Sequence, residues 1–137
     1  MFQARALRFA ALTGALAALV IACSEVSMPE PDEGGLLFAQ NCATCHGSDA
    51  KGRALANGRT APDLTGIALL NGGEFPRARV LSQIDGYGRG KLPADAMPEF
   101  GALLTGETVP VEVDGVLTPT PRPLAALLAY LEDIQAP

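Results

Sequence analysis

Histidine occurs only once in these 137 residues, at His46, and cysteine occurs three times. A closed structural zinc site takes four such ligands, so every histidine and cysteine in the chain would have to meet at one point. Lysine and arginine are also scarce, with ten basic side chains against 15 acidic ones. This acidic balance argues against nucleic acid as a partner, because contacts to phosphate require clustered positive charge.

A hydrophobic run long enough to span a membrane is missing as well. Arg5 and Arg8 are followed by 14 uncharged residues, whereas a spanning helix needs about 20. The pattern is typical of a signal peptide and predicts an export leader over residues 1–22. Residues 20–23, Val-Ile-Ala-Cys, resemble the lipobox of bacterial lipoproteins, in which the cysteine is lipidated and becomes the new N-terminus. We therefore predict a lipid on Cys23, with a plain signal peptide and a leftover thiol as the alternative.

A short acidic segment follows the predicted leader. Residues 23–33 hold two prolines and four acidic side chains with almost nothing apolar, which predicts a flexible tether. The remaining residues, 34–137, supply material for one domain. Loss of the leader would remove two arginines and no acid, leaving eight basic side chains against 15 acidic ones.

Apolar periodicity predicts three main helices in this domain. They cover residues 34–41, 77–84 and 124–134, and in the last one leucines recur at helical spacing behind two prolines that suit a helix start. Residues 109–118 alternate around an Asp-Gly pair, which predicts a short β-hairpin. We therefore predict an all-α fold class, with a small β-hairpin inserted before the C-terminal helix.

The most specific motif is Cys42-Ala-Thr-Cys45-His46. On a helix the two sulfurs lie one turn apart and the imidazole follows at once, so all three can converge on one porphyrin. The motif predicts one covalently attached c-type haem with His46 as the proximal iron ligand. A redox dithiol or a disulfide would not require the histidine, and a zinc site would be left with three ligands if Cys23 is lipidated.

The opposite face of the iron needs a different ligand, because the chain has no second histidine. Met97 is the one methionine within residues 34–137, and the following Pro98 biases its backbone toward an extended conformation. Such a backbone suits a loop that crosses a haem face. We predict Met97 as the sixth ligand, with ordinary core packing as the alternative for this side chain.

Residues 34–134 resemble class I cytochrome c. Besides the haem motif, the family has a glycine and an aromatic residue ahead of the first haem cysteine, with two residues of the last helix packed on them. The matching positions here are Gly34 and Phe38, with Leu127 and Tyr130. The resemblance implies the class I cytochrome c fold, in which three main helices surround one haem.

Two further segments carry the same resemblance. Residues 96–100, Ala-Met-Pro-Glu-Phe, look like the family's axial methionine segment. Residues 61–66, Ala-Pro-Asp-Leu-Thr-Gly, look like the segment whose proline carbonyl accepts a hydrogen bond from the proximal imidazole, which implies this role for Pro62. Residues 101–121 are longer than the link the family needs, and we expect them at or beside the methionine side of the haem crevice. Candidates for contacts to the haem propionates are Arg59, Tyr87 and Arg89.

Two axial ligands would leave the iron no open position, so the remaining reaction is one-electron transfer. We therefore predict an electron carrier without catalytic residues, whose acidic surface suits redox partner proteins with basic docking patches. A lipid on Cys23 would hold it at the periplasmic face of a bacterial membrane, and without the lipid it would be soluble in the periplasm. Two other functions stay open: a cytochrome subunit fixed in a larger oxidoreductase complex, and a five-coordinate haem sensor or enzyme.

Overall fold

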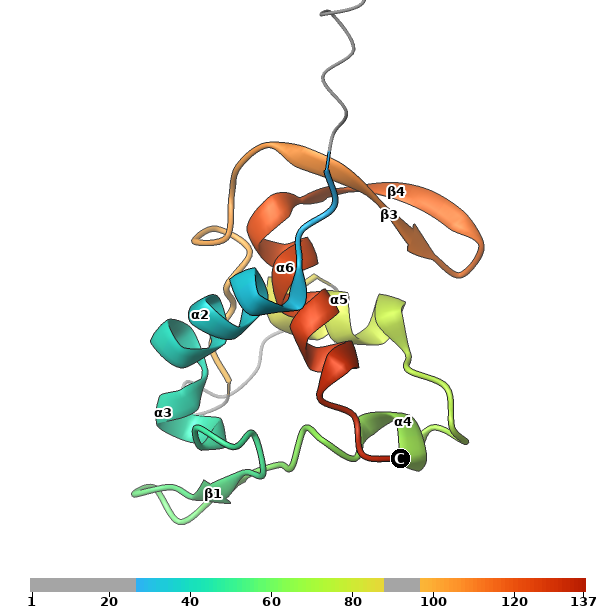
Figure 1. Ribbon diagram of the computed structural model, residues 1–137. Coiled ribbons are helices and arrows are strands. Elements are labelled where there is room, and N and C mark those ends of the chain that lie inside the picture. The colour runs from blue at the N-terminus through green and yellow to red at the C-terminus, as the bar shows by residue number, and fades with distance from the viewer. Residues whose placement is uncertain (1–26, 88–96) are drawn as a thin grey trace, which may run out of the picture.

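The computed structural model describes residues 27–87 and 97–137 (Figure 1). Within them lie five helices, α2 (Pro31–Asn41), α3 (Ala43–His46), α4 (Ile67–Leu70), α5 (Arg77–Asp85) and α6 (Arg122–Asp133). Four strands accompany them, β1 (Arg53–Ala54), β2 (Thr60–Ala61), β3 (Thr108–Val113) and β4 (Val116–Pro121). The predicted leader at 1–22, the lipidation at Cys23 and the propionate candidate Arg89 lie outside the described residues.

The prediction of an all-α fold class is wrong, because the described residues form two small antiparallel sheets beside the helices. In the first, β1 and β2 pair over two residues each, and sequence periodicity misses them because so short a strand contains too little pattern. In the second, β3 pairs with β4, which confirms the predicted hairpin. Its turn residues Asp114 and Gly115 have φ values of 51° and 81°, as a tight two-residue hairpin turn requires.

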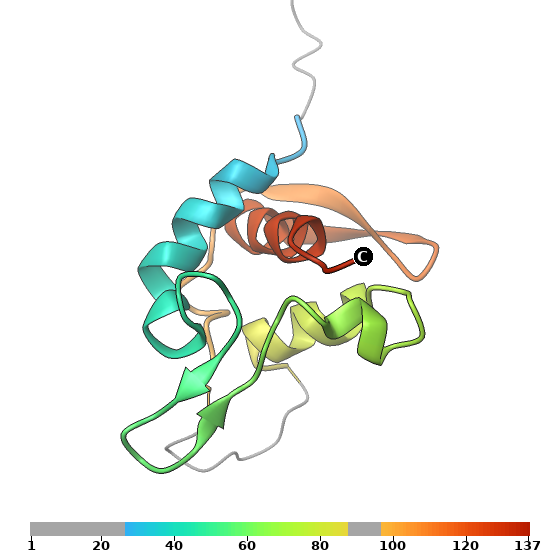
Figure 2. The ribbon, with the colours of Figure 1, turned by 60° about the horizontal axis from the view of Figure 1, so that its bottom comes forward.

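Helices α2 and α6 pack closely because a glycine lies where they meet. A Cβ on Gly34 would overlap the carbonyl oxygen of Ala126 and lie 2.6 Å from the Cβ of Tyr130. One turn further along α2, the rings of Phe38 and Tyr130 have centroids 5.2 Å apart and planes inclined at 43°. The contact between these two rings that the resemblance implies is therefore confirmed. Figure 2 shows the two helices side by side.

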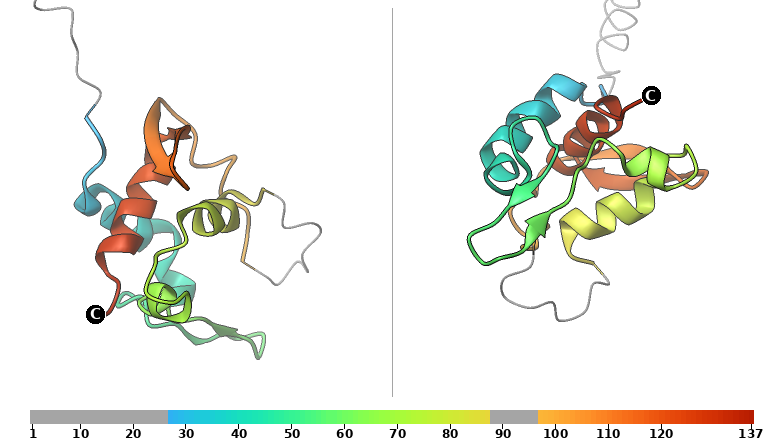
Figure 3. Two further views of the ribbon diagram at one scale, coloured as in Figure 1. Left: turned by 90° about the vertical axis from the view of Figure 1, so that its right-hand side faces the viewer. Right: turned by 90° about the horizontal axis from the view of Figure 1, so that it is seen from below.

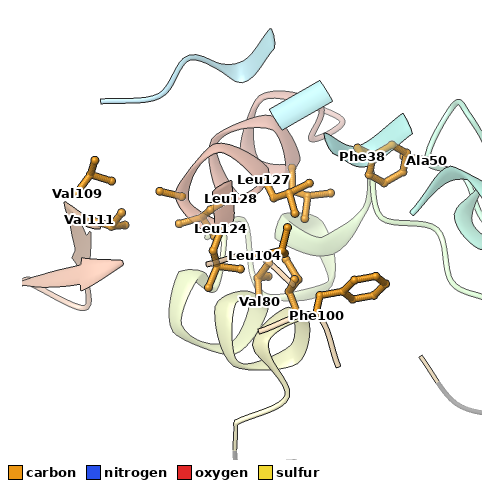
Figure 4. Close-up of a cluster of buried hydrophobic side chains, with 13 residues drawn as sticks. Phe38, Ala50, Val80, Phe100, Leu104, Val109, Val111, Leu124, Leu127 and Leu128 are labelled. Atoms are coloured by element: carbon orange, nitrogen blue, oxygen red, sulfur yellow. The ribbon is translucent and has the colours of Figure 1, made fainter. Parts of the chain in front are cut away.

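The core lies where α6 meets α2, α5 and the hairpin (Figure 4). The largest fully buried side chains are Phe38 of α2, Leu127 of α6 and Val109 of β3. Val111 is also buried, whereas the residues between these two valines and after Val111 are exposed, the period-two alternation of a sheet with one buried face. The hairpin thus completes the core instead of standing out from it.

Arg77 joins the hairpin to two helices (Figures 1 and 3). Its Nη2 lies 2.9 Å from Oε2 of Glu132 on α6, and its Nη1 donates to the main-chain oxygen of Glu112 on β3 at 3.1 Å. We expected residues 101–121 at or beside the methionine side of the haem crevice. The strands of that segment instead pack on α6, and Figure 1 shows them at the opposite end of the molecule from α3.

The first described residues contact the domain. Helix α2 begins at Pro31, within the segment predicted to be a tether, and Pro29 is buried. Arg122 holds Glu33 through two hydrogen bonds of 3.1 and 2.9 Å and donates a third, of 2.7 Å, to the carbonyl oxygen of Ser27. No helix in the described part of the chain has the length and apolar character needed to cross a membrane.

Candidate haem site

Two cysteines and the histidine lie together where α2 passes into α3. Cys42 stands between the helices, and with φ −117° and ψ −35° it leads directly into the single turn of α3. The amide groups of Cys45 and His46 both donate to the carbonyl oxygen of Cys42, at 3.1 and 2.9 Å. Both thiols are free, so the alternative of a disulfide is not realised in this structure. Two sulfurs one helical turn apart beside an imidazole suit two thioether bonds and one axial ligand.

The environment of Cys42 argues against a redox dithiol. Burial, and to a smaller extent the neighbouring Cys45, raise the pKa of the Cys42 thiol to about 11. In redox motifs of the same spacing the attacking cysteine has a pKa lowered to about 3.5 to 7.5, because the thiolate is the nucleophile. Cys42 is thus a protonated, partly buried thiol at neutral pH, while Cys45 is exposed.

The imidazole of His46 is buried and oriented by one main-chain oxygen. Only 7% of the residue is exposed, and its Nδ1 lies 3.1 Å from the carbonyl oxygen of Pro62. A carbonyl oxygen only accepts, so this hydrogen bond requires the proton on Nδ1 and leaves the lone pair on Nε2. Within the described residues, no hydrogen bond of Nε2 occurs. The ring therefore offers Nε2 as a ligand atom.

The segment that contains Pro62 is itself held in place. Asp63 accepts hydrogen bonds from the hydroxyl and the amide of Thr65, at 2.7 and 2.8 Å, and these bonds lower the pKa of Asp63. The side chain of Gln135 bridges the next part of the segment. It donates to the carbonyl oxygen of Leu64 and accepts from the amide of Ala68, both at 2.9 Å. The residue after the end of α6 thus fixes the strand of chain that carries the histidine's acceptor.

Met97, the predicted sixth ligand, belongs to a different part of the site. It is half-buried and packs against the core, and Nε2 of Gln83 on α5 donates to its sulfur at 3.8 Å. The propionate candidates Arg59, in the β1–β2 loop, and Tyr87, after α5, are both exposed. The structure thus brings Cys42, Cys45, His46 and Pro62 together and holds Met97 at α5.

These residues fit a c-type haem better than a bound metal ion alone. Among residues 27–87 and 97–137, no three side chains of histidine, cysteine, aspartate or glutamate gather in a way that could hold a metal ion. Two free thiols beside an imidazole whose Nδ1 proton is already bound are, in contrast, the donor set that attaches and ligates a c-type haem.

Sequence analysis missed Gly52, which lies against this site. Its amide donates to the carbonyl oxygen of His46 at 2.8 Å, and its φ is 75°. The available signal was a glycine placed between the haem motif and the Pro62 segment, two stretches that must come together. Gln135 gave no comparable signal, because its partners are about 70 residues away in the sequence.

Comparison with known proteins agrees with this donor set. The sequence model of the family described as "Cytochrome C oxidase, cbb3-type, subunit III" matches residues 29–110, more than half of the chain. A curated relative, "Cbb3-type cytochrome c oxidase subunit CcoP" of Rhodobacter capsulatus, is 47% identical over 57 residues, which are 42% of this chain and 17% of the relative. The chain thus corresponds to a small part of that relative. No solved structure matches the chain.

Proposed function

The chain belongs to the family of cbb3-type cytochrome c oxidase subunit III, and on this premise we propose that it transfers single electrons as a cytochrome subunit of a larger oxidase complex. Membership in the family means that the protein carries a covalently attached c-type haem with iron. When bound, the haem supplies one-electron exchange between ferrous and ferric iron. The alternative of a freely moving carrier has less support, because the relative is named as an oxidase subunit.

Cys42 and Cys45 are the proposed attachment points, and His46 is the proposed proximal ligand. The observation that carries this assignment is the hydrogen bond of 3.1 Å between Nδ1 of His46 and the carbonyl oxygen of Pro62. It keeps the proton on Nδ1, fixes the plane of the ring and increases the electron donation of Nε2. Pro62 therefore acts through its main-chain oxygen, not through its ring.

Met97 is the proposed ligand on the other face. The half-buried thioether and the Gln83 amide 3.8 Å from its sulfur support a fixed position for that sulfur. With a histidine and a methionine bound, no position would remain for a substrate. This favours electron transfer over a five-coordinate sensor or enzyme.

The surface charge supports partners that present basic groups. Near the hairpin tip, a hollow of about 380 Å³ is lined by the carboxylates of Glu74, Glu112, Asp114 and Glu132, with Arg77 as the one basic residue of the lining. An acidic surface of this kind accelerates association with a positively charged partner, and salt weakens the effect. We propose that a lipid on Cys23 and cleavage after residue 22 place this surface at the periplasmic face of a membrane.

Purification from membranes tests the proposed function. The full chain with a C-terminal tag is extracted in mild detergent and captured, and the captured material is analysed on a native gel and for oxygen consumption with a reduced electron donor. We expect a haem-stained complex much larger than the chain, with oxidase activity. A haem-stained chain that migrates alone under the same conditions would favour the free carrier. Intact mass of the captured chain reports the lipid on Cys23, and Cys23→Ser serves as its control.

A further inference from the structure

Gly52 lies outside the haem motif but contacts both partners of the hydrogen bond that orients His46. We propose that Gly52 is a positioning residue for the proximal histidine, and that the absence of a side chain here sets the strength of the bond between His46 and Pro62. The inference rests on the proposed ligation of iron by His46.

The first observation is the close approach of Gly52 to the Pro62 peptide. A Cβ at position 52 would lie 2.7 Å from the carbonyl carbon of Pro62 and 2.8 Å from its carbonyl oxygen, and it would overlap the carbonyl oxygen of Ala61. Cβ atoms in real proteins essentially never come within 3.0 Å of such atoms. The neighbours are main-chain atoms, so they cannot move aside as the end of a flexible side chain does. A side chain at position 52 must therefore displace the Pro62 carbonyl.

The second observation is that the surrounding chain is tied down on both sides. The amide of Gly52 donates to the carbonyl oxygen of His46 at 2.8 Å. The amide of Leu64 donates to the carbonyl oxygen of fully buried Ala50, also at 2.8 Å, and the carbonyl oxygen of Leu64 is held by Gln135 at 2.9 Å. Residues 50–52 and 62–64 thus cannot separate as rigid units without breaking these bonds. The displacement falls on the carbonyl group of Pro62.

The third observation is that the affected hydrogen bond has little length to spare. Nδ1 of His46 and the oxygen of Pro62 are 3.1 Å apart, near the long end of the usual range of about 2.7 to 3.2 Å. A shift of a few tenths of an ångström would weaken it. A weaker acceptor makes the imidazole a poorer electron donor, which stabilises ferric iron less and raises the reduction potential.

The chain offers a matched control for the cost of a side chain at positive φ. Gly58 lies in the same β1–β2 region, its φ of 79° is close to the 75° of Gly52, and a Cβ there would meet nothing within 4 Å. Gly52→Ala and Gly58→Ala therefore share the backbone strain. Only Gly52→Ala introduces the contact with Pro62.

The experiment compares these variants as complete haem proteins. The readouts are the reduction potential and the rate at which the Nδ1 proton of His46 exchanges with D₂O in the reduced protein, followed by NMR. For Gly52→Ala we expect the equilibrium constant for reduction to rise by up to about tenfold, or about 59 mV for one electron, and the proton to exchange faster. For Gly58→Ala we expect wild-type values. Equal shifts in both variants, or none in either, would overturn the inference.

A second pair of variants covers the case in which Gly52→Ala is not produced. Asparagine adopts positive φ more readily than alanine, so Gly52→Asn and Gly58→Asn keep the steric contrast with less strain. If neither Gly52 variant retains covalent haem while both Gly58 variants do, the positioning role is contradicted, because positioning leaves attachment intact. If the wild-type protein itself lacks histidine ligation, the proposed function fails; if wild type is normal and the pairs agree, only this inference fails.

Discussion

The region around His46 and the region around the hairpin are held together by different kinds of contact. The haem side, which we define as residues 42–66, depends on main-chain groups: the carbonyl of Pro62 orients the histidine, and the amide of Gly52 binds the histidine's own carbonyl. The hairpin side, defined as residues 107–121 with Arg77 and Glu132, depends on buried valines and on ion pairs.

This difference predicts separate effects of mutation. Substitutions on the haem side should change haem attachment or the reduction potential, because few atoms there fix the position of the ligand. Substitutions on the hairpin side should change stability and leave the potential unaltered, because the hairpin and α3 lie at opposite ends of the molecule (Figure 1).

The largest effect is expected when the attachment points are removed. Cys42→Ser combined with Cys45→Ser should abolish covalent haem, measured by intact mass and by haem stain after denaturation. Because the haem supplies apolar surface around which the helices pack, thermal unfolding followed by circular dichroism should lose its cooperativity. Cys23→Ser, outside the domain, should leave both measurements unchanged. Native-like cooperative unfolding of the double variant would contradict a structural role of the haem.

A smaller effect is expected where the two sides share a contact, at α2 against α6. Gly34→Ala places a Cβ on the carbonyl oxygen of Ala126, and overpacking of this kind costs about 1 to 3 kcal/mol of unfolding free energy. In Gly35→Ala the new Cβ would meet only the Tyr130 ring, at 3.4 Å, and alanine is favoured in a helix by about 0.5 to 1 kcal/mol. Denaturant midpoints of the two haem proteins should therefore move in opposite directions, and equal midpoints would show that the helices can separate freely.

On the hairpin side, Arg77→Gln removes the links to Glu112 and Glu132. These groups are partly exposed, so we expect a loss of about 1 kcal/mol at low salt and less at high salt. Amides of β3 and β4 should exchange faster with D₂O. Arg79→Gln, on the same helix, loses only one hydrogen bond to Asn71 and should be near neutral. The reduction potential should stay at the wild-type value in both variants, and a shift in Arg77→Gln alone would join the two sides.

The smallest effect concerns Asp63, whose pKa is lowered first by the hydroxyl of Thr65 and next by its amide. Thr65→Val removes the hydroxyl, so the Asp63 pKa should move back toward its usual range, as followed by NMR titration of the carboxyl carbon. A lowered folded-state pKa contributes stability above the unfolded-state value of about 3.9, and this contribution is lost as the pH falls through the folded-state pKa. Thr65→Ser retains the hydroxyl and should keep the wild-type titration; an unchanged pKa in Thr65→Val would contradict the assignment.

The sequence was informative where function depends on a short run of residue types. The thiol pair and the histidine follow from five consecutive residues, and the hairpin follows from its alternation and its Asp-Gly turn. The fold class was wrong because β1 and β2 are too short to leave a periodic signal. The position of the hairpin was also wrong, because it depends on Arg77, which binds a partner 55 residues away. The importance of Gly52 depends on a close approach of main-chain atoms, which composition and spacing do not reveal.

The most direct test of the electron-transfer site is an optical spectrum of the purified full chain in both oxidation states, with Met97→Ala measured beside it. We predict a methionine-to-iron charge-transfer band in the oxidised wild-type protein that disappears in Met97→Ala. We also predict that the reduced variant binds carbon monoxide readily, whereas the reduced wild type does not. A wild-type protein without the band, whose reduced form binds carbon monoxide as readily as the variant, would contradict a closed site formed by His46 and Met97.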